Sequence, residues 1–435
     1  KIQNQKIKFM KYCISVIFNC FLILLVSSCA KSQEENKKIF QRLDYLCMDS
    51  KLRKIIEVDK DFVRLRSFDN QKNSLPELTI FNNEIPHFLA LTKILTPDSI
   101  EKILIKKGNR NIFPEVKIKK SDSTKKIGLK GKRIAIDAGH FAGNMSTAKI
   151  EQKFLEFKIK NSAGDSVSIR IAEGVLTWQT AYILKSALEK EGAIVMMTRD
   201  SIDATSFGIS YSEWFKTYKG RILDSLKNNQ VISQAEHKKL SKCNSKKFFW
   251  DFFRDYELAN RVKKINAFQP DLTIIIHYNV DEKNTDWKKT TDKNFSMCFI
   301  GGGMSMENFE KPGHKINFLR LLLSDDLDNS ERISKLTVNE FSKNLNIKIA
   351  QSQNADYLKE KCVITNSPGV FCRNLALCRG VNSPLVYGEC LYQDNSEECI
   401  KLMQTDKIFS NIKTSQRVKT VADCYFNAAK KYFQE

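Results

Sequence analysis

From Arg133 to the end of the chain, short apolar runs alternate with longer segments in which apolar residues recur at helical spacing. The apolar runs predict strands over residues 133–137, 194–198, 272–277, 295–300 and 385–387. The helical spacing predicts helices over residues 174–191, 256–268 and 330–345. Alternating strands and helices are typical of an α/β sheet.

Three segments are longer than such a sheet requires. Residues 153–174 alternate apolar and polar positions on both sides of a Ser-Ala-Gly-Asp turn, which predicts a β-hairpin. Residues 201–254 are polar, helical in pattern and rich in aromatic side chains, and residues 301–328 begin with three glycines. We interpret each segment as an insertion, so the α/β core should carry helical insertions.

The part of the chain before Arg133 has a different character. Residues 39–116 contain Leu- and Phe-rich pieces without a recognisable motif, and they predict a small N-terminal mixed domain of unknown role. A basic linker follows at residues 117–132. The α/β domain should therefore occupy residues 133–435.

An apolar stretch near the start of the chain predicts export. Lys11 follows Met10, an apolar run extends to Val26, and small residues precede Cys29, as in a secretory signal. The run is shorter than the about 20 residues that span a membrane. The ending "VSSC" resembles the lipobox of bacterial lipoproteins, which implies cleavage after residues 1–28, acylation of Cys29, and a polar tether at 29–38. The alternatives are an uncleaved membrane anchor, or an ordinary thiol at Cys29.

The net charge bears on the class of partner, and the cysteine spacing bears on the state of the thiols. The formal net charge of +21 favours an anionic partner. If the chain is exported, we expect its anionic partner to be a polymer or lipid surface of the cell envelope and not nucleic acid. The protein would then face the periplasm or the cell exterior. An evenly charged soluble surface is the alternative. The cysteines after Cys29 include no C-x-x-C pair, so we expect most of them to be buried thiols.

Residues suited to metal binding and proton transfer stand near the ends of predicted strands. His140 follows the first strand, His277 ends "DLTIIIH", Glu389 follows "PLVYG", and Glu173 begins the first long helix. The carboxyl ends of parallel strands form the edge at which α/β proteins bind ligands. Two imidazoles and one carboxylate make a hydrolytic zinc set, and a second carboxylate could carry protons. Position alone does not separate the two glutamates, and a histidine can simply cap a strand.

Four blocks, in order, resemble one known family. They are "RIAIDAGH", the glutamate before the helix that leads to "GAIVMMTRDS", "ELANRVKKINAFQPDLTIIIHYNV", and "SPLVYGECLYQDNSEE". Together they resemble the zinc-dependent N-acetylmuramoyl-L-alanine amidases of the amidase-3 type over about residues 131–430. The resemblance implies an open, mostly parallel sheet flanked by helices. It also implies a substrate, the peptidoglycan amide between the lactyl group of muramic acid and L-alanine.

The resemblance also implies roles for individual residues. His140, Glu173 and His277 would bind Zn²⁺, and Glu389 would be the catalytic carboxylate that takes a proton from water and returns it to the departing amine. Weaker candidates for holding substrate, each with a structural role as the alternative, are Asn279 and Arg373. The expected protein is an envelope amidase with a lipid anchor, and a protein activator is a further candidate partner. The alternatives are a catalytically silent wall-binding or regulatory lipoprotein, and a zinc peptidase acting on another envelope amide.

The sequence departs from the family pattern near the expected site at Phe141-Ala142, at Val280 and at Cys390, and it carries the insertion at 301–328. Phe141 and Ala142 replace the glycines that usually follow the first histidine, so we expect a bulkier loop and a different cleft. The insertion at 301–328 lies where some relatives carry a blocking segment. One hypothesis is that Glu307, Glu310 or His314 touches the zinc in a resting state, and the alternative is a helical excursion on the surface.

Overall fold

The computed structural model describes residues 37–69, 74–75, 77–111, 113, 127–160 and 164–434. The chain forms two units, one ending at Asp44 and the other beginning at Tyr45, and the second unit contains everything discussed below. The predicted signal, Cys29 and most of the basic linker lie outside the described residues. Among the described helices, none has the length and apolar character that crossing a bilayer requires.

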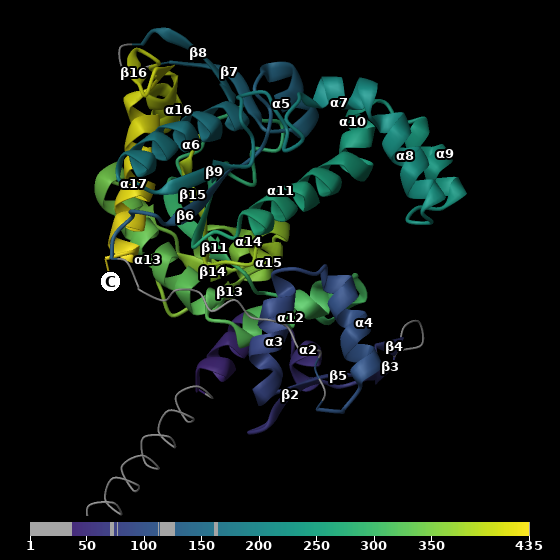
Figure 1. The fold of residues 1–435 in the computed structure, drawn as a ribbon. Coiled ribbons are helices and arrows are strands. Elements are labelled where there is room, and N and C mark those ends of the chain that lie inside the picture. The colour runs from purple at the N-terminus through teal and green to yellow at the C-terminus, as the bar shows by residue number, and fades with distance from the viewer. Residues whose placement is uncertain are drawn as a thin grey trace, which may run out of the picture. The chain divides into compact units, whose positions relative to one another are not determined.

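The centre of the second unit is an eight-stranded sheet (Figure 1). Its strands are β6 (Arg133–Ala138), β9 (Ile194–Met197), β10 (Leu272–Asn279), β11 (Phe295–Ile300), β12 (Lys348–Ile349), β13 (Val363–Ile364), β14 (Val370–Cys372) and β15 (Leu385–Tyr392). The order is β13-β14-β11-β15-β10-β6-β9, with β12 beside β11. The pairs β15-β10, β10-β6 and β6-β9 are parallel, whereas β11 runs antiparallel to β15 and β13 to β14. The prediction of an open, mostly parallel α/β sheet is confirmed.

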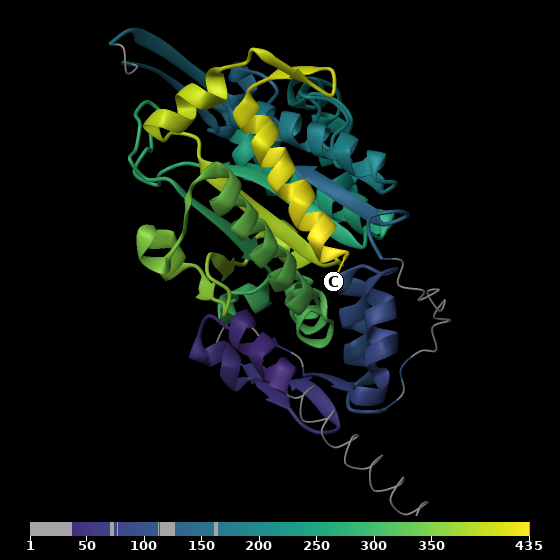
Figure 2. The same cartoon turned by 90° about the vertical axis from the view of Figure 1, so that its left-hand side faces the viewer.

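Helices cover both faces of this sheet. One face packs against α6 (Glu173–Lys190), α13 (Asp326–Leu345) and α17 (Gln416–Tyr432), and Figure 2 shows α13 and α17 side by side across it. The other face packs against α11 (Arg254–Phe268), α14 (Asp356–Glu360) and α15 (Ala376–Gly380). Ile134 and Ile136 are buried on the first face and Ala135 on the second. Because both faces are buried, the central strands appear in the sequence as continuous apolar runs.

The last strand is longer than the sequence predicted. β15 continues to Tyr392, so Glu389 lies inside a strand and not after it. The prediction was wrong because Gly388 resembles a strand break. In the structure this glycine admits the hydroxyl of Tyr425, which donates a hydrogen bond to the Gly388 carbonyl at 3.1 Å. A Cβ at position 388 would lie 2.2 Å from that hydroxyl, so the glycine permits a close approach within the strand.

Two of the predicted insertions have the expected structure. Strands β7 (Phe154–Lys160) and β8 (Ser166–Ala172) form the predicted antiparallel hairpin, and α5 (Met145–Glu151) precedes it. The second insertion forms an arm that extends from the sheet (Figure 1). The arm contains α7 (Tyr211–Thr217), α8 (Lys219–Asn228), α9 (Gln234–Ser241) and α10 (Ser245–Phe248), and a π-helical turn, η2 (Phe249–Phe253), joins it to α11. Its core is a cluster of buried aromatic side chains that includes Trp214, Phe248 and Phe253.

The residues before the linker mix strands and helices. They contain α2 (Ser50–Lys54), β1 (Ile56–Val58), β2 (Phe62–Leu65), β5 (Leu78–Phe81), α3 (Ile85–Thr92) and α4 (Pro97–Lys107). Strands β1, β2 and β5 form a small antiparallel sheet. The third insertion supplies α12 (His314–Leu323), which packs against α3 and α4 and forms an ion pair between Lys315 and Glu101. The domain boundaries given above stay predictions.

The remaining elements are short, apart from α16, and complete the connections. They are β3 (Phe68–Asp69), β4 (Ser74–Leu75), η1 (Asn82–Glu84), η3 (Met306–Glu310), η4 (Ser352–Asn354), α16 (Ser396–Met403), β16 (Lys407–Phe409) and β17 (Ile412–Thr414). The cysteines from Cys243 onward are buried thiols, as expected.

A buried ion pair attaches α4 to η1, the turn that directly follows the small antiparallel sheet. The Lys107 ammonium lies 2.8 Å from the Glu84 carboxylate, and both side chains are 3% exposed. The ammonium also donates a hydrogen bond to the Thr79 carbonyl at 3.0 Å. Removing one partner of such a pair leaves an uncompensated charge in the interior, which is strongly destabilising.

We therefore expect Lys107→Met to lower the free energy of unfolding by about 3 kcal/mol. The matched control is Lys106→Met, because Lys106 is exposed on the same helix, and its effect should stay within about 0.5 kcal/mol. Urea unfolding followed by circular dichroism measures both. Equal midpoints for the two variants would contradict the role given to the pair.

Candidate active site

His140 stands on a loop with an unusual backbone just beyond β6. Its φ angle is +49°, in the left-handed region that side chains other than glycine rarely adopt. The neighbouring Gly139 has no room for a side chain, since a Cβ there would lie 2.0 Å from Nε2 of His277. The two imidazole rings consequently lie edge to face, with centroids 4.9 Å apart. The glycine of the "DAGH" block thus permits the two histidines to approach each other.

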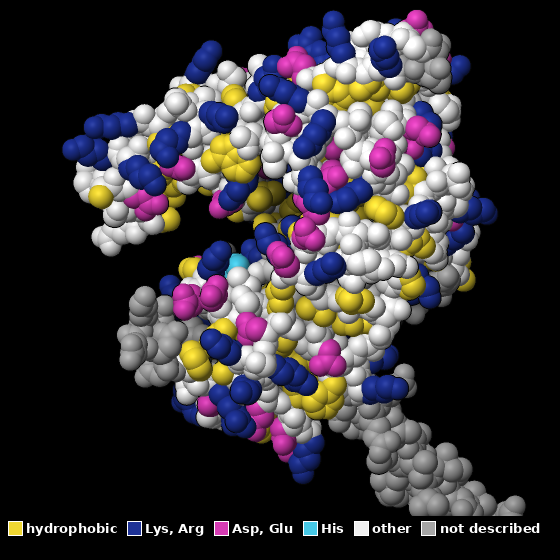
Figure 3. Space-filling model, turned by 180° about the vertical axis from the view of Figure 1, so that it is seen from behind, with side chains coloured by type: hydrophobic (Ala, Val, Ile, Leu, Met, Phe, Trp, Pro, Cys, Tyr) yellow, Lys and Arg dark blue, Asp and Glu magenta, His cyan; other side chains and the backbone are white. Residues whose placement is uncertain are grey.

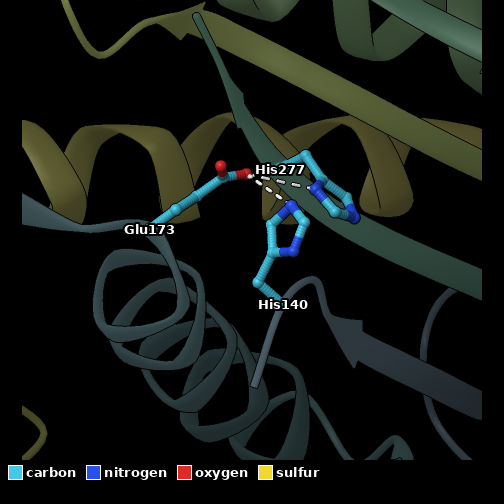
Figure 4. A group of neighbouring side chains, drawn as sticks. All are labelled: His140, Glu173 and His277. Carbon is cyan, nitrogen blue, oxygen red and sulfur yellow. Dashed lines mark hydrogen bonds and ion pairs between the residues drawn. The ribbon is translucent and has the colours of Figure 1, made fainter. Parts of the chain in front are cut away.

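His140, Glu173 and His277 come together at the carboxyl edge of the sheet (Figure 4). Oε1 of Glu173 lies 3.1 Å from Nδ1 of His277 and 3.6 Å from Nε2 of His140. One potential ligand atom from each residue lies within 4.8 Å of the others. The three residues come from the loop after β6, the start of α6 and strand β10, so the fold brings together residues that are far apart in the sequence.

The Glu173 carboxylate is buried and held by several donors. Oε1 accepts a hydrogen bond from the Tyr278 amide at 3.2 Å, and Oε2 accepts one from the Gln393 side chain at 3.1 Å. Burial alone would raise the pKa of Glu173, but His140 and the hydrogen bond from His277 outweigh it and lower the pKa to about 2. The group is therefore an anion held in a fixed orientation.

Glu151, at the end of α5, orients the first histidine. Its Oε1 lies 2.9 Å from Nδ1 of His140, while Oε2 accepts hydrogen bonds from the amides of Phe141 and Ala142 at 3.4 and 3.2 Å. The carboxylate is buried. A carboxylate on Nδ1 keeps the proton on that nitrogen and directs the lone pair of Nε2 towards Glu173 and His277. One side chain thus fixes both the loop and the tautomer of the histidine.

The Phe141–Ala142 pair has a structural use. Phe141 is 2% exposed and packs against aromatic rings of the arm, with centroid distances of 5.9 Å to Tyr211, 5.7 Å to Phe249 and 5.9 Å to Phe253. The bulkier loop that the sequence predicted therefore contacts the arm directly, through the residue that follows His140.

Buried arginines fix the backbone around the group. Arg199 donates hydrogen bonds to the carbonyls of Ala138 at 3.1 Å, Phe141 at 3.3 Å and Gly174 at 2.7 Å. The carbonyls of Ala138 and Phe141 lie on either side of His140 in the chain, and that of Gly174 directly follows Glu173. Arg261 lies 3.1 Å from the Asp137 carboxylate, so the buried negative charge of Asp137 is balanced by a buried positive charge.

Glu389 lies beside the group but is not part of it. It is the register partner of His277 on the adjacent parallel strand. Its Oε2 atom is buried and has no hydrogen-bond partner among the described residues. Burial raises the pKa of Glu389 to about 7, although His277 opposes the shift. A carboxylate in this position can both accept and release a proton near neutral pH.

The two weaker candidates meet at a residue that the sequence did not suggest. The amide of Asn279 donates to the Tyr357 hydroxyl at 3.0 Å, and the Arg373 guanidinium lies 4.9 Å from the centroid of the same ring. The Tyr357 hydroxyl also donates to Met297 Sδ at 3.4 Å, and Met297 is the register partner of Glu389 on β11. Asn279 and Arg373 therefore line the side of the site next to Glu389.

Sequence reasoning missed Glu151, Gln393 and Tyr357. Glu151 lies in the segment between His140 and Glu173, where no motif marks it. Gln393 lies within the last of the four blocks, "SPLVYGECLYQDNSEE", directly after β15, and no local signal marked it because the strand was expected to end at Tyr387. Tyr357 had none, since it belongs to the short helix α14, far from the other site residues in sequence.

The third insertion does not supply a ligand to this group. The set of potential metal ligands found among the described residues contains neither Glu307, Glu310 nor His314. The alternative of a surface excursion is also wrong, because α12 is buried along its length, from His314 to Leu323. The insertion is instead bonded to the N-terminal part of the unit, where the Met306 amide donates to Asp49 at 2.9 Å.

The fold and the site define an α/β protein with a His–Glu–His group of metal-ligand type at the carboxyl edge of its sheet. A family model described as N-acetylmuramoyl-L-alanine amidase matches residues 134–415, more than half of the chain. The chain therefore belongs to the N-acetylmuramoyl-L-alanine amidase family of the amidase-3 type. No curated protein matches the sequence.

Several solved amidase structures are similar to this chain. The CwlD amidase of Clostridioides difficile, determined in complex with the GerS lipoprotein, is 17% identical with a TM-score of 0.37, covering 69% of this chain and 98% of that one. Ami1 of Mycobacterium abscessus is 13% identical with a TM-score of 0.36, covering 70% and 99%. The catalytic domain of CwlV from Bacillus (Paenibacillus) polymyxa var. colistinus is 14% identical with a TM-score of 0.35, covering 69% and 97%.

The donor set fits a zinc ion. Two ligand atoms about 2.0–2.1 Å from a tetrahedral zinc lie roughly 3.3 Å apart. The separations from Glu173 Oε1 to the two histidine nitrogens, 3.1 and 3.6 Å, lie on either side of that value. The bonds from Glu151 to His140 and from Gln393 to Glu173 are of the kind that orients zinc ligands.

We expect Glu151→Gln to weaken zinc binding by roughly 10- to 100-fold. A glutamine amide that donates to Nδ1 of His140 would shift the ring proton to Nε2, the nitrogen that faces the group. Titration against a chromophoric chelator measures the affinity directly, without any assay of activity. The control is Glu156→Gln, which changes a half-exposed carboxylate on the following strand. Wild-type affinity in Glu151→Gln, with an unchanged melting temperature, would contradict the orienting role.

Proposed function

We propose that this protein is a zinc-dependent peptidoglycan amidase that hydrolyses the amide between N-acetylmuramic acid and L-alanine. The observation that carries the proposal is the His140–Glu173–His277 group with Glu389 beside it, in a chain of the amidase family. The two imidazoles and the carboxylate of the group would hold the zinc ion. When bound, zinc polarises an amide carbonyl and makes a nearby water more acidic.

The chain's own residues supply the remaining chemistry. Glu389 takes the proton from the attacking water and later delivers it to the departing amine of L-alanine. Its unpartnered, buried Oε2 atom suits this task, because no protein donor competes for it among the described residues. Its neighbour His277 stacks on Tyr387 at a centroid distance of 4.5 Å, which fixes the plane of that imidazole.

Substrate is held on the side of the site next to Glu389. Asn279 and Arg373 converge on Tyr357 there and offer hydrogen-bond donors to an amide or a sugar. The lipid anchor at Cys29, the location in the cell envelope and a protein activator belong to the same proposal. The lipid anchor and the location are supported by the N-terminal sequence pattern.

Two variants separate the roles of the metal group and Glu389. Glu389→Gln should retain zinc but lower the release of stem peptides from purified sacculi by about 10²- to 10⁴-fold. His140→Ala should lose both zinc and activity, since a ligand is missing. Mass spectrometry of the released peptides and metal analysis of the purified variants measure both effects.

The products distinguish the candidate functions. Released peptides that begin with L-alanine support the amidase, whereas cleavage at another amide would indicate a zinc peptidase. Binding to sacculi without any release would indicate the catalytically silent alternative. Full activity in Glu389→Gln would overturn the role given to this carboxylate.

A further inference from the structure

A cavity of about 330 Å³ opens beside the His–Glu–His group. Its volume is in the range of small-molecule sites. His140 and His277 line one part of it, and Leu375, Ala376 and Leu377 line another. A third part of the lining consists of Phe249, Trp250 and Arg254, supplied by the end of the arm and the start of α11. In the space-filling view the arm overhangs a hollow with hydrophobic side chains in its depth (Figure 3).

Trp250 is held so that its ring forms a wall of this cavity. It lies on the π-helical turn η2, and its indole Nε1 donates a hydrogen bond to the Ile150 carbonyl at 3.1 Å. The Phe249 ring supports it edge to face, with centroids 5.1 Å apart. Because the turn is π-helical, it adds a residue to the helix and changes the direction of the side chains that follow.

The charges that line the cavity are unevenly balanced. The acids Glu151 and Glu257 are buried and already engaged, the first with His140 and the second with Arg261 at 2.7 Å. Two cations remain at more accessible positions. Lys153 is half-buried, and Arg254 is exposed and lies 5.4 Å from the centroid of the Trp250 ring.

The nearest acid to Arg254 does not cancel its charge. Asp255 contacts Nε of the guanidinium at 2.9 Å, and both side chains are open to solvent. Such a pair contributes little, and it does not use the fork of Nη groups that binds carboxylates in a bidentate manner. The cavity therefore offers aromatic and aliphatic walls with accessible cations.

We propose that Trp250, Arg254 and Lys153 form a subsite for a carboxylate-bearing part of the stem peptide, next to the amide that is cleaved. The inference rests on the proposed function, because the same cavity contains the two histidines of the metal group. Stem peptides present free carboxylates close to the L-alanine amide. A peptide seated over the histidines thus brings a carboxylate to Arg254 and Lys153, and its aliphatic portion to Trp250 and the leucines.

The test uses two muramoyl dipeptides that differ in one group. In the first, the residue after L-alanine carries a free α-carboxylate, and in the second that carboxylate is an amide. Binding of each is measured by calorimetry in the full chain carrying Glu389→Gln, so that turnover does not intervene. The parent should prefer the free acid.

Removing the guanidinium should abolish part of that preference. Arg254→Gln should raise the dissociation constant of the free acid about fivefold and leave that of the amide unchanged. Lys153→Gln should act in the same direction, and Arg254→Lys should retain part of the preference because it keeps the charge. The matched control is Arg221→Gln, which removes an exposed arginine that stacks on Tyr218 at 4.8 Å elsewhere in the arm.

The outcomes are distinct from those for the proposed function. Equal losses for both dipeptides in Arg254→Gln, or no preference in the parent, including no detectable binding of either, would overturn the subsite. If the wild type cleaves neither dipeptide nor sacculi while the charge-dependent preference persists, the amidase proposal fails and the subsite stands.

Discussion

The site depends on the hydrogen bonds that the buried guanidinium of Arg199 donates. Its hydrogen bonds reach the carbonyls of Ala138, Phe141 and Gly174, so a single planar group ties the loop that carries His140 to the start of the helix that carries Glu173. The residue itself is fully buried. A rigid fork of donors suits this task better than an ammonium, which has no fixed geometry. The positions of two potential ligands are set by one side chain that is not itself a ligand.

The fold was predictable because the central strands are buried on both faces. Continuous apolar runs such as Ile274–Ile276 leave few other structures open, and the prediction from them agreed with the sheet. The end of β15 was not predictable, because Gly388 carries the sign of a strand break while its actual use is to admit Tyr425. That use depends on a helix near the end of the chain, which local pattern cannot reveal.

The residues of the site also fall into a group that the sequence predicted and a group that it did not. His140, Glu173 and His277 lie at or near the element ends that the sequence marks, although β10 continues to Asn279, and they come together as the parallel topology requires. Glu151, Gln393 and Tyr357 act through contacts between distant segments, and nothing in their local sequence distinguishes them from ordinary polar residues. The third insertion shows the same limit. Its length predicted an excursion, but only the contacts of α12 with α3 and α4 reveal that it is an internal layer.

The placement of Phe141 has a consequence for exchanging parts between members of this family. The arm's aromatic core uses this side chain as part of its own packing, directly next to a residue of the metal group. An arm of this type placed on a relative with two glycines at this position would lack the Phe141 ring against which its own aromatic side chains pack. A chimaera that exchanged the arm without residue 141, or residue 141 without the arm, would lose the contacts of Phe141 with the aromatic rings of the arm.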